Sequence, residues 1–66
     1  MNLGENIRKA RNAAGMTQKE LADQLQVYAK DICRWENGER IPSAVTFGKI
    51  CKELHASADE LLELNK

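Results

Sequence analysis

The chain has 66 residues, the length of one small domain, so we expect no second, ligand-sensing domain. Ten basic and ten acidic residues give a formal net charge of zero, so the basic excess typical of nucleic-acid binders is missing and any anion-binding face must be local. The two cysteines lack metal-ligand spacing, and neither a signal peptide nor an 18-residue apolar run occurs, so we expect a soluble cytoplasmic protein with reduced thiols and no metal, cofactor or membrane anchor.

No segment alternates with the period of a β-strand, and five segments with helix signals predict an all-α fold. The first helix is predicted over residues 3–13, with Asn2 and Glu5 as a weak form of the capping box at its start. Gly15 suits the left-handed position just after its end. Its apolar positions are Leu3, Ile7, Ala10 and Ala14.

The second helix, predicted over residues 18–25, has the clearest start. In the capping box TQKE, Thr17 is expected to accept a hydrogen bond from the backbone N–H of Glu20, and the Glu20 side chain to accept one from the Thr17 N–H. Only about three residues, 26–28, separate this helix from the next, a link short enough for the steep crossing of a helix-turn-helix. Its apolar positions are Leu21, Ala22 and Leu25.

The third helix, predicted over residues 29–36 and ended by Gly38, has two different sides. At about 100° per residue, one side is a bulky anchor of Tyr28, Ile32 and Trp35. Small, charged and hydrogen-bonding residues occupy the other side: Lys30, Cys33, Arg34 and Asn37, flanked by Ala29 and Asp31. Such a face is usually solvated surface, so its neighbours decide whether it binds a partner.

The last two helices are predicted over residues 43–54 and 58–64, with His55 ending the first of them. Ser57 and Glu60 repeat the capping box at the start of the second. Their apolar positions are Ala44, Phe47, Ile50, Cys51 and Leu54, then Ala58, Leu61, Leu62 and Leu64. None of the five helices is long enough to be stable alone, so mutual burial must hold them together.

The stretch TQKELADQLQVYAKDICRWENGERIPS resembles the Cro/XRE-type helix-turn-helix DNA-binding family, five-helix repressor domains of phages and bacteria. The likeness runs from about Leu3 to Leu62. The matching positions are Ile7, Arg11, Gly15, Thr17, Gln18, Leu21, Ala22, Leu25, Val27, Ile32, Glu36, Asn37, Gly38, Pro42, Phe47, Ile50, Leu54 and the segment SADELL. The resemblance implies one five-helix domain over residues 1–66, with its third helix in the DNA major groove.

The family's functional positions imply a role for individual residues. Those that read bases fall on Tyr28, Ala29, Lys30, Asp31 and Arg34. Those that hold DNA phosphates fall on Thr17, Gln18 and Asn37, and Arg40 in the following loop is a further phosphate candidate. The resemblance also implies a buried ion pair between Arg11 and Glu36, tying the first helix to the end of the third.

Three positions depart from the family pattern. Gln26 stands where the family usually has a glycine in the turn, and a left-handed residue other than glycine costs roughly 1 kcal/mol, which predicts an adjusted turn. Tyr28 replaces the Ser or Thr cap of the third helix; its ring packs on Ile32 or its hydroxyl reaches a phosphate. Asp31 accepts from a cytosine amino group, positions Lys30 or Arg34, or is a solvated acid.

Each candidate also has a plainer interpretation. Arg34 contacts guanine or a phosphate, or forms a surface ion pair with Asp31 or Glu36, and Lys30 contacts DNA or is solvated. Cys33 lies near the binding face, but a redox switch there lacks a visible low-pKa environment. We expect Cys51 to fill the core and Trp35 to anchor its edge.

Two functions follow, from different classes. One is a sequence-specific, double-stranded DNA-binding transcriptional regulator, a repressor by the resemblance. The other is a protein-interaction module of the same fold, antitoxin-like or a co-activator, favoured by the neutral charge and Asp31. An enzyme is not expected, because the sequence offers no nucleophile–base pair, metal set or phosphate loop.

One short helix reads only about four or five base pairs, so we expect a homodimer on an inverted repeat. The apolar surplus at the C-terminal end predicts the interface, through Leu61, Leu62 and Leu64, with Val45 adding to it.

Overall fold

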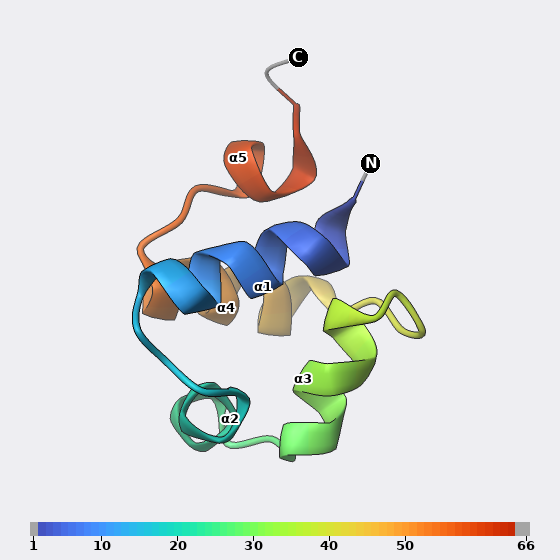
Figure 1. The fold of residues 1–66 in the computed structure, drawn as a ribbon. Coiled ribbons are helices and arrows are strands. Elements are labelled where there is room, and N and C mark those ends of the chain that lie inside the picture. The colour runs from blue at the N-terminus through green and yellow to red at the C-terminus, as the bar shows by residue number, and fades with distance from the viewer. Residues whose placement is uncertain (1, 65–66) are drawn as a thin grey trace.

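The protein is described over residues 2–64 by a computed structural model, in which five helices surround one core (Figure 1). The helices are α1 (Leu3–Ala13), α2 (Gln18–Leu25), α3 (Ala29–Glu36), α4 (Ala44–Leu54) and α5 (Ala58–Leu62). The predicted five-helix, all-α fold is confirmed, and no strand occurs within residues 2–64.

Two predicted helix boundaries were wrong. Ser43 is the cap of α4 rather than its first residue, and its Oγ accepts a hydrogen bond from the Thr46 N–H at 3.2 Å. Helix α5 stops two residues early because Glu63 adopts a left-handed conformation (φ 57°, ψ 39°). The backbone then turns back, and the Leu64 N–H donates to the Asp59 carbonyl at 2.9 Å.

The two strong capping boxes are formed as expected, but the weak one is not. In the first, the Glu20 N–H donates to Thr17 Oγ1 at 3.0 Å, and the Thr17 N–H donates to Glu20 Oε1 at 2.8 Å. Ser57 makes the same exchange at the start of α5. Asn2 instead donates its side-chain amide to Glu5 Oε2 at 3.1 Å. Its backbone (φ −122°, ψ 59°) lies outside the extended region in which a cap side chain reaches the helix N–H groups.

The turn between α2 and α3 keeps a left-handed residue without glycine. Gln26 adopts φ 59° and ψ 43°, so the adjusted turn predicted from this substitution was wrong. The strain of roughly 1 kcal/mol is offset in part by the Val27 N–H, which donates to the Ala22 carbonyl at 3.0 Å. Gly15 and Gly38 occupy the predicted positions after α1 and α3, with φ of 72° and 80°.

Helix α1 packs against both α3 and α5, while α2 packs against α3 and α4. Figure 1 shows α1 crossing the middle of the fold between α5 and the α2–α3 pair. A side chain at Gly4 would lie 2.6 Å from the Glu36 carbonyl oxygen and closer still to that of Trp35. Glycine at this position therefore lets α1 approach the end of α3. At the other side of α1, the Asn6 amide donates to the Leu61 carbonyl at 2.9 Å.

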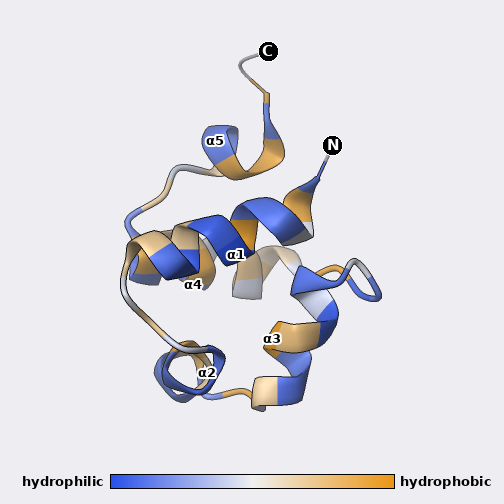
Figure 2. Cartoon of the chain, viewed as in Figure 1, coloured by the Kyte–Doolittle hydropathy of each residue, from blue (hydrophilic) through white to orange (hydrophobic). Residues whose placement is uncertain are grey.

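The core takes apolar side chains from all five helices, as the hydropathy colouring suggests (Figure 2). Its buried members are Ile7, Leu21, Ala22, Leu25, Ile32, Ile50, Leu54 and Leu61. Four predicted apolar positions are instead exposed: Ala14, Ala44, Ala58 and Leu64. In residues 2–64, no helix combines the length and apolarity needed to cross a membrane.

Candidate functional site

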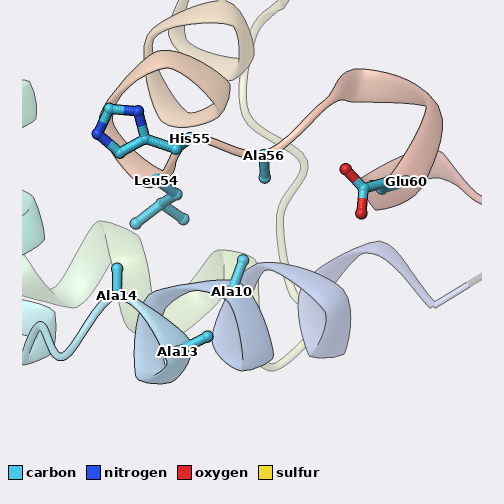
Figure 3. Close-up of a pocket in the computed structure, with 7 residues that line it drawn as sticks. All are labelled: Ala10, Ala13, Ala14, Leu54, His55, Ala56 and Glu60. Carbon is cyan, nitrogen blue, oxygen red and sulfur yellow. The ribbon is translucent and has the colours of Figure 1, made fainter.

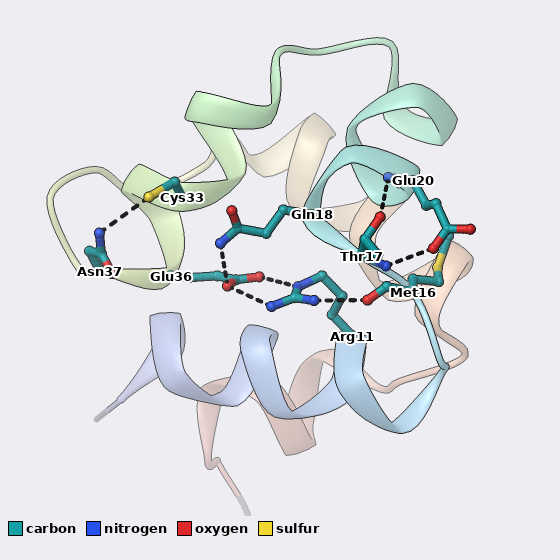
Figure 4. A network of polar contacts seen from close by, with 8 residues as sticks. All are labelled: Arg11, Met16, Thr17, Gln18, Glu20, Cys33, Glu36 and Asn37. Carbon is teal, nitrogen blue, oxygen red and sulfur yellow. Dashed lines mark hydrogen bonds and ion pairs between the residues drawn. The ribbon is translucent and has the colours of Figure 1, made fainter.

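A buried polar network joins α1 to the end of α3 and supports the start of α2 (Figure 4). The expected ion pair between Arg11 and Glu36 is present. Arg11 donates from Nε to Glu36 Oε2 at 2.6 Å and from Nη2 to Oε1 at 3.1 Å. Its Nη1 donates to the Met16 carbonyl at 2.8 Å, and the Glu36 side chain is only 2% exposed. The two-bond fork to Glu36 and the bond to Met16 together satisfy three guanidinium donors, and the fork fixes where α3 ends relative to α1.

Gln18, the first residue of α2, is tied to this pair rather than free in solvent. Its Nε2 donates to Glu36 Oε1 at 3.0 Å, the oxygen that also accepts from Arg11 (Figure 4). The sequence placed Gln18 at a phosphate contact and gave no signal of this second partner. A carboxyamide carries two N–H groups on its nitrogen, so one donor remains for another ligand.

The N-terminus of α2 leaves two further donors. The capping box occupies the backbone N–H groups of Thr17 and Glu20. Among the described residues, the N–H groups of Gln18 and Lys19 have no acceptor. Free N–H groups at a helix start attract anions, since the helix dipole adds to their partial positive charge.

The front face of α3 presents the predicted polar side chains to solvent. Ala29 and Lys30 are exposed, and Arg34 is partly exposed. Within residues 2–64, neither Lys30 nor Arg34 forms an ion pair. The surface ion pair of Arg34 with Asp31 or Glu36 is therefore not formed: Glu36 pairs with Arg11, and Oδ2 of Asp31 accepts from the Tyr28 N–H.

Tyr28 and Asp31 behave differently from the sequence-based expectations. The Tyr28 side chain is 74% exposed, so it neither belongs to the bulky anchor nor packs on Ile32. The remaining alternative, a hydroxyl free to reach a phosphate, fits this exposure. Asp31 Oδ2 accepts from the Tyr28 backbone N–H at 3.2 Å, which forms the reciprocal half of a capping box although the side-chain cap itself is missing. An acid three residues after the cap position is the signal that could have revealed this role.

The end of α3 and its following loop hold the other predicted contacts. Asn37 is exposed, and its amide donates to Cys33 Sγ at 3.4 Å (Figure 4). Arg40 is exposed, with no ion pair among the described residues, and its backbone N–H donates to the Arg34 carbonyl at 3.3 Å. These bonds hold the loop against α3, so Arg40 lies on the same side of the domain as the end of that helix.

The remaining sulfur and aromatic positions are structural. Cys51 and Trp35 are partly buried against the core, as expected. Burial raises the pKa of the Cys51 thiol above its ordinary value, and a backbone hydrogen bond opposes that shift. Neither cysteine is in a disulfide.

A depression of about 410 Å³ in the described surface lies between α1 and the α4–α5 junction (Figure 3). Alanines form most of its wall, and the only titratable groups there are His55 and Glu60, drawn at opposite sides of the view. Within residues 2–64, no group of three or more His, Cys, Asp or Glu side chains could hold a metal ion. The polar site is therefore at α2 and α3, away from this depression.

The apolar surface at the C-terminal end differs from the prediction in one residue. Leu61 is only 3% exposed, a core residue that a partner cannot contact. Leu62 is partly buried and, with Leu3, Trp35 and Ile41, lines a groove of about 310 Å³. The large aliphatic side chains exposed among the described residues are Leu64, Val45 and Ile41, at 64%, 73% and 81%.

Comparison with known proteins finds the same architecture elsewhere. Residues 4–66 match the family described as helix-turn-helix domain. The restriction-modification controller protein C.AhdI from Aeromonas hydrophila superimposes with a TM-score of 0.83 at 28% identity, covering 91% of each chain.

Three curated regulators are similar in sequence. The HTH-type transcriptional regulator ImmR of Bacillus subtilis is 36% identical over 62 residues, 94% of this chain and 49% of that protein. The HTH-type transcriptional activator BcrR of Enterococcus faecalis is 34% identical over 94% of this chain and 30% of its own length. The cryptic phage CTXphi transcriptional repressor RstR of Vibrio cholerae is 31% identical over 92% of this chain and 54% of its own. The chain thus spans about half, or less, of the curated relatives it matches.

Proposed function

We propose that this chain, which belongs to the helix-turn-helix domain family, binds double-stranded DNA sequence-specifically and regulates transcription as a repressor. The Cro/XRE-type resemblance seen in the sequence is confirmed by the family match and by the regulators similar to it. The proposed role is binding rather than catalysis, carried by residues 1–66 as one domain. Its place is the cytoplasm, at the bacterial nucleoid or in a phage-infected cell, where duplex DNA is accessible.

The observation that carries this proposal is the unpaired polar face of α3. Lys30 and Arg34 project from a helix whose back is fixed by Ile32 and by the Arg11–Glu36 pair, and neither has an ion-pair partner among the described residues. A helix with one rigid apolar side and one free polar side fits the width of the major groove.

Five side chains on this face are proposed to read bases: Tyr28, Ala29, Lys30, Asp31 and Arg34. Arg34 suits the two acceptors of guanine, the commonest specific contact. Asp31 is held by the Tyr28 N–H, so its second oxygen is a fixed acceptor suited to a cytosine amino group. The small side chain of Ala29 suits a thymine methyl group.

Four residues around this face are proposed to hold phosphates: Thr17, Gln18, Asn37 and Arg40. Gln18 combines a side-chain N–H with the free backbone donors at the start of α2. Arg40 supplies a charge from the loop after α3. Such contacts set the orientation of α3 in the groove without reading sequence.

We also propose a homodimer on an inverted repeat. Half-sites in such operators lie about 34 Å apart, and the domain is 31 Å along its longest axis, so two adjacent copies with that axis along the DNA would span the required distance. The accessible apolar residues for the contact are Leu62, Leu64 and Val45, and Ile41 lines the same groove as Leu62. Because this patch is small, the dimer should be weak without DNA.

The test is enrichment of duplexes from a random pool, followed by anisotropy titration of the selected duplex against a scrambled one. We expect an inverted repeat whose half-sites lie about one helical turn apart, bound at least ~10³-fold more tightly than the scrambled duplex. Sedimentation across a concentration range should show two protomers per duplex. Absence of any enriched sequence at low salt would overturn the proposal.

A protein-interaction module is the second candidate, and the net charge of zero favours it. Such a module would bind the selected and the scrambled duplex equally weakly. It would also stay monomeric, with one protomer per duplex at most.

A further inference from the structure

The buried Glu36 carboxylate has a contact that its role in the ion pair does not require. Its Oε1 accepts from two donors, Arg11 Nη2 at 3.1 Å and Gln18 Nε2 at 3.0 Å. Arg11 already makes two hydrogen bonds to Glu36, so the ion pair is bidentate without the bond from Gln18. The additional donor comes from the first residue of α2, a proposed phosphate contact. The network therefore links a buried carboxylate to the surface where DNA is proposed to bind (Figure 4).

An ionised carboxylate accepts hydrogen bonds but cannot donate them, whereas a glutamine amide has one donating and one accepting end. Next to Glu36, only the orientation that turns Nε2 toward the carboxylate avoids two facing acceptors. In this orientation, the second N–H on the same nitrogen has no partner among the described residues. The reversed amide would instead bring its carbonyl oxygen near a bound phosphate, which is also an acceptor.

We propose that Glu36 is a positioning residue for DNA: it fixes the Gln18 amide so that a donor rather than an acceptor is available to the phosphate. This inference rests on the proposed function and names a part of its machinery. The paired charge of Arg11 offsets the negative charge of Glu36, so the carboxylate orients Gln18 without repelling the phosphate. The strength of the phosphate contact thereby depends on an ion pair that never touches DNA.

The first test is spectroscopic and needs no DNA. Any glutamine amide gives two separate Nε2 proton signals in NMR spectra, and in the free protein the separation for Gln18 should be wider than for a solvated glutamine, because one of its protons donates to a carboxylate. Gln24, exposed on the same helix, is the internal reference with averaged surroundings. In Glu36→Gln, a neutral residue of the same size, the Gln18 signals should move toward those of Gln24. Gln18 signals that already match Gln24 in the unaltered protein would overturn the proposal.

The second test is a double-mutant cycle on affinity for the selected duplex, at a temperature where circular dichroism shows every variant folded. Gln18→Ala should weaken binding ~10-fold, as expected for a hydrogen bond to a charged group. Glu36→Gln should weaken binding several-fold alone and cause no further loss in the Gln18→Ala background. Lys19→Ala is the matched control from the same helical turn, and its effect should add to that of Glu36→Gln.

The outcomes separate this inference from the proposed function. If Glu36→Gln weakens binding equally with and without Gln18, its effect is structural and the positioning role is wrong. If Gln18→Ala binds as tightly as the unaltered protein, Gln18 holds no phosphate and the inference fails, while sequence-specific binding stands. Failure of the unaltered protein to bind any duplex overturns both.

Discussion

Replacing Arg11 with alanine should destabilise the domain strongly. The substitution removes two hydrogen bonds to Glu36, at 2.6 and 3.1 Å, and one to the Met16 carbonyl at 2.8 Å. Glu36, whose side chain is 2% exposed, keeps only Gln18 as a donor. Leaving a buried charge without its partner costs roughly 3–5 kcal/mol.

That loss is large relative to the total free energy of unfolding of the domain. At roughly 0.05–0.15 kcal/mol per residue, a domain of this size has about 3–10 kcal/mol of stability to lose. Each kcal/mol shifts the melting temperature of a small domain by about 4–8 °C. Arg11→Ala should therefore lower the melting temperature by more than ~12 °C, or leave the chain unfolded at room temperature.

Arg8→Ala is the matched control, the same substitution on the same helix. Arg8 faces solvent and pairs with Glu5 at 3.4 Å, so its removal should cost less than ~1 kcal/mol. Thermal unfolding followed by circular dichroism, with urea titration at one temperature, measures both. Replacing Arg11 and Glu36 together by methionine should recover part of the loss, because no buried charge is then unpaired. Similar melting temperatures for Arg11→Ala and Arg8→Ala would refute the reasoning.

Three further predictions concern packing, DNA contacts and thiol chemistry. Gly4→Ala should destabilise by roughly 1–3 kcal/mol because its methyl group meets backbone oxygens, whereas Gly48→Ala, with open space around it, should stabilise by roughly 0.5–1 kcal/mol; equal effects in urea titrations would contradict this contrast. Arg34→Ala should cost ~1–3 kcal/mol of binding and relax specificity at one base pair, whereas Arg40→Ala should weaken all duplexes alike and reduce the salt slope by about 1. Because burial raises the pKa of Cys51, its alkylation near pH 8 should be slower in the folded protein than in urea, where a larger fraction is thiolate; equal rates would contradict that assignment.

Helix positions were predictable because their signals are local. Thr17 and Glu20 satisfy each other across three residues, so the sequence alone specifies where α2 begins. Gly15 and Gly38 mark helix ends for a similar local reason. Asn2 shows the limit: a cap also needs an extended backbone, and the conformation of Asn2 is not encoded in its identity.

Apolar periodicity predicted the large core residues and overcounted the small ones. Ile7, Leu21 and Ile50 are completely buried, as their spacing indicated. Ala14 and Ala58 have the right spacing but are exposed, since alanine loses little by facing water and fits either side of a helix. Periodicity alone therefore cannot assign alanines to the core.

The helices that carry the candidate site residues were predicted from the sequence, but the hydrogen-bond partners of those residues were not. The sequence predicted that Gln18 and Asp31 contact DNA. Gln18 also donates to Glu36, which depends on how α2 and α3 meet, and Asp31 accepts from the Tyr28 N–H, which depends on its rotamer. Only one of these partnerships, the acid three residues after a helix cap, has a sequence signal. The other joins residues 18 positions apart across a helix crossing.

Net charge argued against DNA binding, and the structure explains why that argument is weak. Several acidic side chains already have partners within the domain. Glu5, Asp23 and Glu36 form ion pairs, and Glu20, Asp31 and Glu60 accept hydrogen bonds from backbone N–H groups. The proposed site has three cations without ion-pair partners among the described residues: Lys30, Arg34 and Arg40. The adjoining loop has one exposed acid, Glu39. A neutral chain can therefore present a small basic face. Because that face carries few charges, the dependence of affinity on salt should be shallow, with a slope of roughly −2 to −3 per protomer. A slope near zero would mean that these cations do not contact phosphates, and a much steeper one would place further contacts outside the residues proposed.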